Sequence, residues 1–202
     1  MAMRLDHQLR EQIFRKHTTF PITYFQDELA ELPQFTGPLH WHPDFELASA
    51  EFSILEYQVG QQRILLEPGD SIFINGNVLH GVKQLDGSQT EPMPNIVFSG
   101  SAIAPENSII FQKYIKPIAL CDQMPFVVFR HNDLNQDEVN NWLKDIYSRL
   151  RRQENCFEMA VQRNLSKIFE YLFCNFECLP KTEVSRIQIT AQIRIQKMLS
   201  YI

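Results

Sequence analysis

The stretch that decides the fold is residues 37–82, which opens with GPLHWHPDFELAS (37–49) and closes with EPGDSIFINGNVLHGV (67–82). It alternates runs of β-branched and aromatic residues, which favour strands, with turn-forming residues. The turn signals are Pro43-Asp44, Gly60-Gln61, Pro68-Gly69-Asp70 and Gly76-Asn77. The expected strands are 38–42, 45–50, 52–58, 62–66, 71–75 and 78–84. Short strands at such regular spacing indicate an antiparallel barrel or sandwich.

Four polar side chains stand out in this stretch: His40, His42, Glu46 and His80. Side chains on a strand alternate faces, so the shared parity of the first three places them on one face. A strand returning after the turn could bring His80 opposite them. Three imidazoles and a carboxylate facing one interior are a ligand set for a divalent metal such as Fe, Mn, Ni or Zn. They also suit the polar floor of a pocket for a small polar molecule without metal.

The rest of the first two thirds adds strands and two less regular segments. Further strands are expected at 21–25, 95–99 and 126–130. Residues 107–118 are expected to form a short helix or an irregular segment beside the barrel mouth. Residues 5–16 carry apolar side chains at helical spacing, which predicts either a short amphipathic helix or a loosely held N-terminal arm.

The periodicity changes to helical after residue 133. One helix is expected across 135–152, with Asn135 or Asp137 as its cap, and a second follows a break near Glu154-Asn155 and ends at Pro180. A third helical pattern in 185–202 stops without an end signal, which favours a chain that continues.

The apolar stripes of the two long helices exceed what one neighbouring helix can cover, which favours a homodimer. The candidate interface residues are Trp142, Ile146, Leu165, Phe169, Leu172 and Phe176. The alternative is that both stripes simply pack on the barrel.

Composition excludes several classes of protein. The net charge is −5 and no dense basic patch is present, so any DNA contact is expected outside these residues. No signal peptide or membrane-length apolar run is found, which predicts a cytoplasmic protein without a membrane partner. The sequence has no nucleophile elbow, phosphate-binding loop or HExxH motif. An enzymatic function would therefore depend on the metal.

The pattern HxHxxxE, followed by PGD and a later His, resembles the two motifs of the cupin superfamily of small β-barrels. Four segments resemble more closely the N-terminal sensing domain of AraC-type transcription regulators, over roughly residues 20–202. They are FPITYFQDEL (20–29), HWHPDFEL (40–47), PGDSIFINGNVLH (68–80) and NSIIFQKYIKPI (107–118). The chain departs from the cupin pattern at Ser53, where a Gly is usual, and in the run before His80.

The resemblance implies a mainly β fold, a cupin-like jelly-roll barrel followed by an α-helical pair for dimerisation. It divides the chain into an N-terminal arm or short helix (1–19), an effector-binding barrel (20–134), a helical dimerisation segment (135–184) and the start of a linker or first helix of a DNA-binding domain (185–202). The implied function is effector sensing, with DNA bound only through a helix-turn-helix domain beyond this chain. The alternative is a metal-dependent cupin enzyme, a dioxygenase or isomerase.

Overall fold

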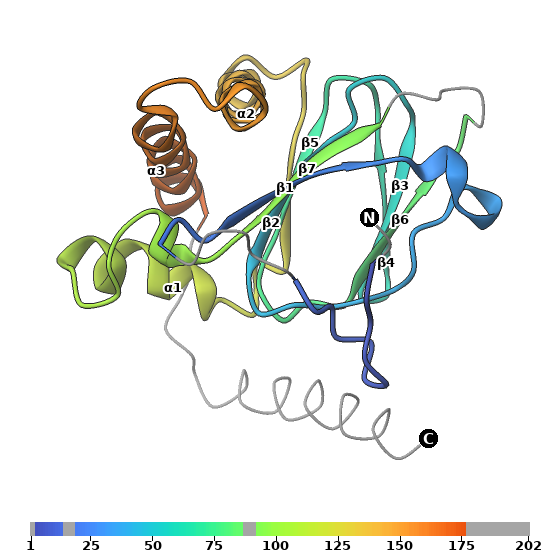
Figure 1. Cartoon of the computed structure of the whole chain (residues 1–202), viewed down its shortest axis with the longest axis horizontal. Coiled ribbons are helices and arrows are strands. Elements are labelled where there is room, and N and C mark those ends of the chain that lie inside the picture. The colour runs from blue at the N-terminus through green and yellow to red at the C-terminus, as the bar shows by residue number, and fades with distance from the viewer. Residues whose placement is uncertain (1–2, 14–18, 87–91, 177–202) are drawn as a thin grey trace.

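A computed structural model describes residues 3–13, 19–86 and 92–176. Two antiparallel sheets face each other, and two long helices cover the outer face of one of them (Figure 1). The larger sheet has the strand order β1 (Ile22–Asp27), β7 (Met93–Phe98), β2 (Phe45–Ser49), β5 (Ser71–Ile74) and β8 (Phe126–Phe129). The smaller sheet has the order β4 (Gln62–Leu66), β3 (Leu55–Val59) and β6 (His80–Gln84). The predicted fold class, a mainly β barrel with C-terminal helices, is confirmed.

Strand β2 separates the two hydrophobic cores of the molecule. Phe45 and Leu47 point toward the helices and belong to the larger core, whereas Ala48 belongs to the core between the sheets. Every residue of β2 is buried because both faces of this central strand are covered. Glu46 has the parity of Ala48 and therefore projects between the sheets. A carboxylate in such a place requires polar partners.

The helices follow the predicted pattern with one correction. Helix α2 (Leu134–Arg152) and helix α3 (Phe157–Asn175) lie side by side against the larger sheet (Figure 1). The N-cap of α2 is Asp133, whose carboxylate accepts hydrogen bonds from the backbone N–H groups of Asn135 and Gln136, so neither predicted cap residue serves. Residues 107–118 contain the π-helical turn Phe111–Ile115, which continues into α1 (Lys116–Ala119). No helix in the described part of the chain is long and apolar enough to cross a bilayer.

The larger core contains most of the side chains that were expected between two copies. Ile146, Leu165 and Leu172 are fully buried within one copy, and Phe169 is 2% exposed. They pack on the larger sheet together with Phe45, Phe73 and Phe98, so they offer no surface to a second copy and their assignment to the contact is not retained. Trp142 and Phe176 remain partly exposed at the edge of this core. The apolar stripes of α2 and α3 therefore pack mainly on the barrel, which was the alternative to a dimer contact.

The N-terminal segment is not helical in residues 3–13, so of the two expectations for residues 5–16, a short helix or an N-terminal arm, the helix is wrong over this part. The chain turns back on itself there, with a bridge between Leu5 and Glu11, and Arg10 pairs with Trp41. Several expectations lie outside the described residues: the remainder of the 5–16 segment beyond residue 13, the helix end at Pro180, and the linker or first helix at 185–202.

Asp70 joins the β4–β5 turn to the segment between β8 and α2. It is 1% exposed, and its carboxylate accepts hydrogen bonds from Arg130 Nη1 (2.6 Å), His131 Nδ1 (2.9 Å) and the backbone N–H of His131 and Glu67 (each 3.0 Å). Burial alone would raise the pKa of Asp70, but these donors outweigh it and hold the pKa below its ordinary value of 3.8. The sequence suggested only that Asp70 forms a turn. In the structure its hydrogen bonds also connect the barrel to the segment that leads into α2.

Replacing Asp70 with alanine is expected to lower the free energy of unfolding by about 2–3 kcal/mol, because several donors lose their acceptor. A carboxyl group whose pKa is lowered by folding stabilises the folded state at pH values above its pKa in the unfolded chain. The contribution of Asp70 should therefore be complete above about pH 5 and be lost progressively as the pH falls from there through the lowered pKa of the folded state. Urea unfolding at pH 7 and pH 3 measures both effects. Glu56→Ala, which removes an exposed pair with Arg63, is the control and should cost under about 1 kcal/mol. An equal loss in both variants at pH 7 would contradict the role of Asp70.

Candidate metal centre

The structure brings His40, His42, Glu46 and His80 together at one end of the barrel. One ligand atom from each lies within 4.8 Å of the corresponding atom of every other. The four residues are 7%, 1%, 5% and 1% exposed, respectively. Glu46 comes from β2 and His80 begins β6, so the site joins the two sheets at the point where their ends meet. A backbone bridge between His40 and His80 closes this end, with N–O distances of 2.8 and 2.9 Å.

The convergence does not depend on shared parity along one uninterrupted strand. His40 sits in an isolated bridge, and β2 begins only at Phe45, after the bend at Pro43-Asp44. The bend is held from the opposite side, where Asn77 N–H donates to His42 O at 2.7 Å. Gly76 lies so close to the Pro43 carbonyl that a Cβ at this position would clash with it. The direction of the His42 side chain is therefore set by this local bend and not by its position along a regular strand.

The hydrogen bonds of the three rings fix which nitrogen carries the proton. Nδ1 of His40 faces Pro38 O (3.0 Å), Nδ1 of His42 faces Asp44 O (3.0 Å), and Nδ1 of His80 faces Val78 O (2.8 Å). A carbonyl only accepts, so each Nδ1 must donate. In the neutral ring this leaves the lone pair on Nε2, and the three Nε2 atoms belong to the inner side of the cluster. This backbone support of the outer nitrogen is the usual arrangement behind metal-ligating histidines.

The carboxylate of Glu46 lies between two of these Nε2 atoms. Its Oε2 is 3.0 Å from Nε2 of His80 and 3.2 Å from Nε2 of His42. Burial alone would raise the pKa of Glu46, but His80 and His42 outweigh it and hold the pKa well below its ordinary value. With neutral rings, lone pairs would meet lone pairs at these distances. The contacts are favourable only if a proton or a metal cation lies between the atoms.

The donor set and its size fit a divalent metal ion. Metal–ligand bonds to imidazole nitrogen and carboxylate oxygen are about 2.0–2.2 Å long, so ligand atoms around one ion lie about 3–4.4 Å apart. The 4.8 Å limit of the cluster is close to this value, and a small contraction would close it. An organic molecule could not enter between Glu46 and His80 without separating atoms that are in hydrogen-bond contact. The space between these four ligand atoms therefore suits a single ion.

Two further acidic residues lie near the site, and the sequence analysis missed both. Glu11 Oε2 is 3.8 Å from His40 Nε2, and both side chains are 8% exposed. Burial, with repulsion from Glu46, raises the pKa of Glu11 to about 7. Burial raises the pKa of Asp27 to about 6, although Asn95 Nδ2 donates to it at 2.6 Å. Neither residue belongs to a motif, and only the path of the backbone brings Glu11 to the site.

A cavity lies away from the His–Glu cluster, next to α2. It has a volume of about 310 Å³ and is lined by Ser49, Ala50, Glu51, Phe52, Gly69, Ser71 and Lys144. Three hydroxyl groups meet beside it: Ser49 Oγ is 2.9 Å from Ser71 Oγ and 3.2 Å from Tyr147 OH. A small organic molecule would fit a cavity of this size.

Comparison with known proteins gives one relative in sequence and a likeness in fold. No family model matches the chain. The chain is 20% identical over 198 residues to the uncharacterized HTH-type transcriptional regulator YdeC of Bacillus subtilis (strain 168), a match that covers 98% of this chain and 66% of that regulator. The chain thus spans slightly less than two thirds of its relative.

Among solved structures, apo ToxT from Vibrio cholerae superimposes with a TM-score of 0.51 at 10% identity, covering 77% of this chain and 56% of ToxT. At this level of identity the likeness concerns the fold alone, and it agrees with the barrel followed by helices seen in Figure 1. The chain is therefore similar along nearly its whole length to an HTH-type transcriptional regulator, and it shares its fold with part of ToxT.

Proposed function

We propose that this chain is the sensing and dimerisation domain of a cytoplasmic transcription regulator and that the His–Glu cluster holds a divalent cation as its signal. DNA would be bound by a helix-turn-helix domain outside these residues. The observation that carries the metal proposal is the convergence of three imidazoles and one carboxylate. Nε2 of His42 and of His80 contact Glu46, and each of the three rings is supported from behind by a carbonyl. The likeness to an HTH-type regulator supports regulation as the purpose of the site.

A cation agrees with the site better than a small polar organic effector, because the four side chains are already in contact. An organic effector would need separate room, and the cavity of about 310 Å³ beside Lys144 offers it. The alternative of a metal-dependent enzyme requires a substrate to reach the ion. The four proposed ligands are at most 7% exposed, which supports sensing rather than turnover.

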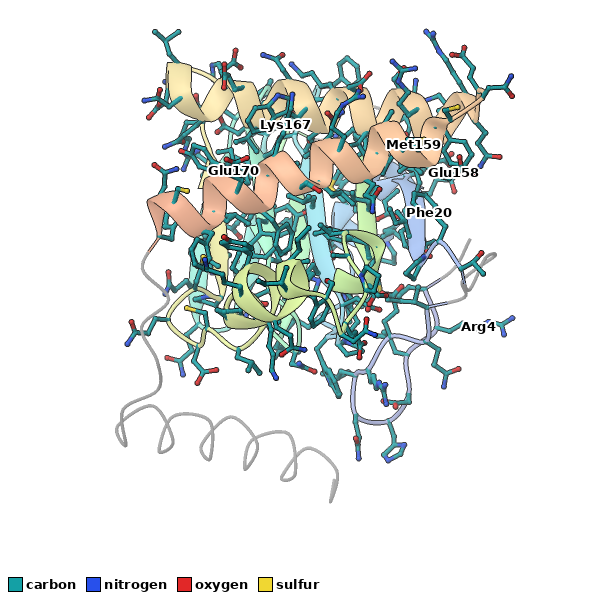
Figure 2. All side chains as sticks on the ribbon, turned by 90° about the vertical axis from the view of Figure 1, so that its left-hand side faces the viewer. Arg4, Phe20, Glu158, Met159, Lys167 and Glu170 are labelled. Atoms are coloured by element: carbon teal, nitrogen blue, oxygen red, sulfur yellow. The ribbon has the colours of Figure 1, made fainter. Side chains whose placement is uncertain are left out.

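We place the contact between two copies on the outer face of α3 instead of its buried stripe. Glu158, Met159 and Glu170 lie on this face in Figure 2, and Lys167 extends from it over the Trp142 ring of α2, with its Nζ 5.2 Å from the ring centre. In an antiparallel pairing of two α3 helices, Glu158 of each copy would meet Lys167 of the other. The exposed side chain of Met159, at 69%, would be covered in the same contact. This complementarity makes the face suited to a symmetric dimer.

A route from the cluster to the helices is present in the hydrogen bonds of Asn75. Its Nδ2 donates to Ile118 O at 2.7 Å, with Met124 O at 3.2 Å, and its Oδ1 accepts from Gly76 N–H, next to the turn that aims His42. Ile118 belongs to α1, which packs in the same core as α3. The cation would act as a switch only if it binds one arrangement of these parts more tightly than the other.

A reporter fusion tests the proposal. Residues 1–202 are joined to a DNA-binding domain that represses only as a dimer, and repression is measured with and without a metal chelator. We expect repression that changes several-fold on chelation in the wild type, no response in His80→Ala, and weakened repression in Lys167→Glu that Glu158→Lys restores. Restoration follows because the double exchange recreates the opposite charges. Repression indifferent to both chelator and charge exchange would overturn the proposal.

A further inference from the structure

The N-terminal segment is tied directly to the strand that carries the histidines. Trp41, between His40 and His42, is held by three hydrogen bonds: its backbone N–H donates to Leu9 O at 3.0 Å, its carbonyl accepts from Glu11 N–H at 2.9 Å, and its ring Nε1 donates to Gln8 O at 2.9 Å. The guanidinium of Arg10 lies 5.5 Å from the centre of the Trp41 ring. These contacts fix residues 8–11 across the end of the barrel.

The same contacts aim the side chain of Glu11 inward. Along this segment Arg10 is exposed, whereas the carboxylate of Glu11 is 8% exposed and 3.8 Å from Nε2 of His40. That nitrogen is the inner, lone-pair-bearing atom of the ring, since Nδ1 donates to Pro38 O. Glu11 therefore approaches the cluster from the side opposite to the backbone supports.

The charges around the cluster are unbalanced without a cation. In the described part of the chain, Glu11 and Glu46 form ion pairs with histidines only, and no Lys or Arg reaches either carboxylate. The buried carboxylates of Glu11 and Glu46 repel each other, and each has lost most of its hydration. One divalent cation bound by three neutral imidazoles would offset the negative charge of Glu46 and of the nearby Glu11 and Asp27.

We propose that Glu11 is a fifth ligand of the divalent cation, so that metal binding fastens residues 4–12 over the barrel. This inference rests on the proposed metal site and adds to it a residue from outside the His–Glu motif. A carboxylate oxygen 3.8 Å from one ligand nitrogen is within the spacing of neighbouring ligands around one ion. Five or six ligands that include two carboxylates favour Mn²⁺ or Fe²⁺ over the tetrahedral preference of Zn²⁺.

Titration with Co²⁺ and with Mn²⁺ tests this assignment. Glu11→Gln keeps the size of the side chain and removes its charge. We expect at least a tenfold loss of Mn²⁺ affinity, because even indirect partners of metal ligands contribute about 10–100-fold. The visible spectrum of bound Co²⁺ should become more intense in Glu11→Gln, as expected when a fifth ligand is lost. Glu11→Asp, one methylene shorter, should retain part of the affinity.

Hydrogen exchange of the Glu11 and Trp41 amides adds a second measurement. Mn²⁺ should slow both at least tenfold in the wild type and leave them nearly unchanged in Glu11→Gln. Arg10→Ala is the control for loosening of the segment, and its Mn²⁺ affinity should stay within about threefold of the wild type. Unchanged Mn²⁺ affinity and Co²⁺ spectrum in Glu11→Gln, with a wild type that binds, would overturn this inference and leave the four-residue site standing. A wild type that binds neither ion would overturn both.

Discussion

Phe169→Ala is expected to lower the free energy of unfolding by about 3–5 kcal/mol. The Phe169 ring is 2% exposed and lies 5.0, 5.9 and 6.1 Å from the rings of Phe45, Phe73 and Phe98. Removing it would leave a cavity between α3 and the larger sheet that three aromatic rings of a rigid sheet cannot fill. Urea unfolding at neutral pH measures the loss.

The matched control is Phe173→Ala, one helical turn later. Phe173 is 37% exposed and contacts chiefly Tyr114, so its removal should cost under about 1.5 kcal/mol. Sedimentation of both variants completes the test. Because Phe169 packs within one copy, its loss should weaken folding and not the association of folded copies. If Phe169→Ala were fully stable but monomeric, Phe169 would have to lie in the contact between two copies, which would contradict its placement in the core.

The second large effect is expected for His80→Ala, which removes one proposed metal ligand. The affinity for the metal should fall by at least about 100-fold. For the wild type, free Mn²⁺ at 100 times its dissociation constant should stabilise the fold by about 2.7 kcal/mol. In a chain of this size that corresponds to a rise in melting temperature of roughly 5–10 °C. Neither His80→Ala nor Glu46→Gln should show the rise. Thermal unfolding with and without Mn²⁺ measures the difference.

His7→Ala serves as the control for this experiment, because His7 is exposed and lies outside the cluster. It should melt like the wild type in both conditions. A metal-dependent rise that survives in His80→Ala and Glu46→Gln alike would show that the ion binds elsewhere.

The sequence predicted which residues meet, but for a partly mistaken reason. The shared parity of His40, His42 and Glu46 would place them on one face only along an uninterrupted strand, and they meet although Pro43 interrupts it. Their convergence depends on Gly76 and Asn77, which hold the bend from the opposite turn. Contacts between a turn and a bend distant in sequence have no periodic signature. Strands β2, β4, β5 and β6 lie within two residues of their predicted ends because turn residues flank them, whereas β3 begins at Leu55 and not at residue 52, where no turn residue marks the start.

Other features could not be predicted because they depend on tertiary packing. The sequence pattern of the apolar stripe of α3 is the same whether the helix packs on a sheet or on a second copy. Only the structure shows that Leu165 and Phe169 are buried within a single copy. Within residues 5–13, the helical spacing is overridden by backbone pairing between Arg10 and Trp41. Glu11 lies outside every motif, so nothing in the sequence connects it with His40.

The measurement that tests the central claim most directly is anomalous diffraction from crystals of the protein grown with Mn²⁺. The account predicts one strong peak at about 2.0–2.3 Å from Nε2 of His40, His42 and His80 and from a carboxylate oxygen of Glu46. A cluster without a peak at saturating Mn²⁺, in which the rings still hydrogen-bond to Glu46 directly, would contradict it.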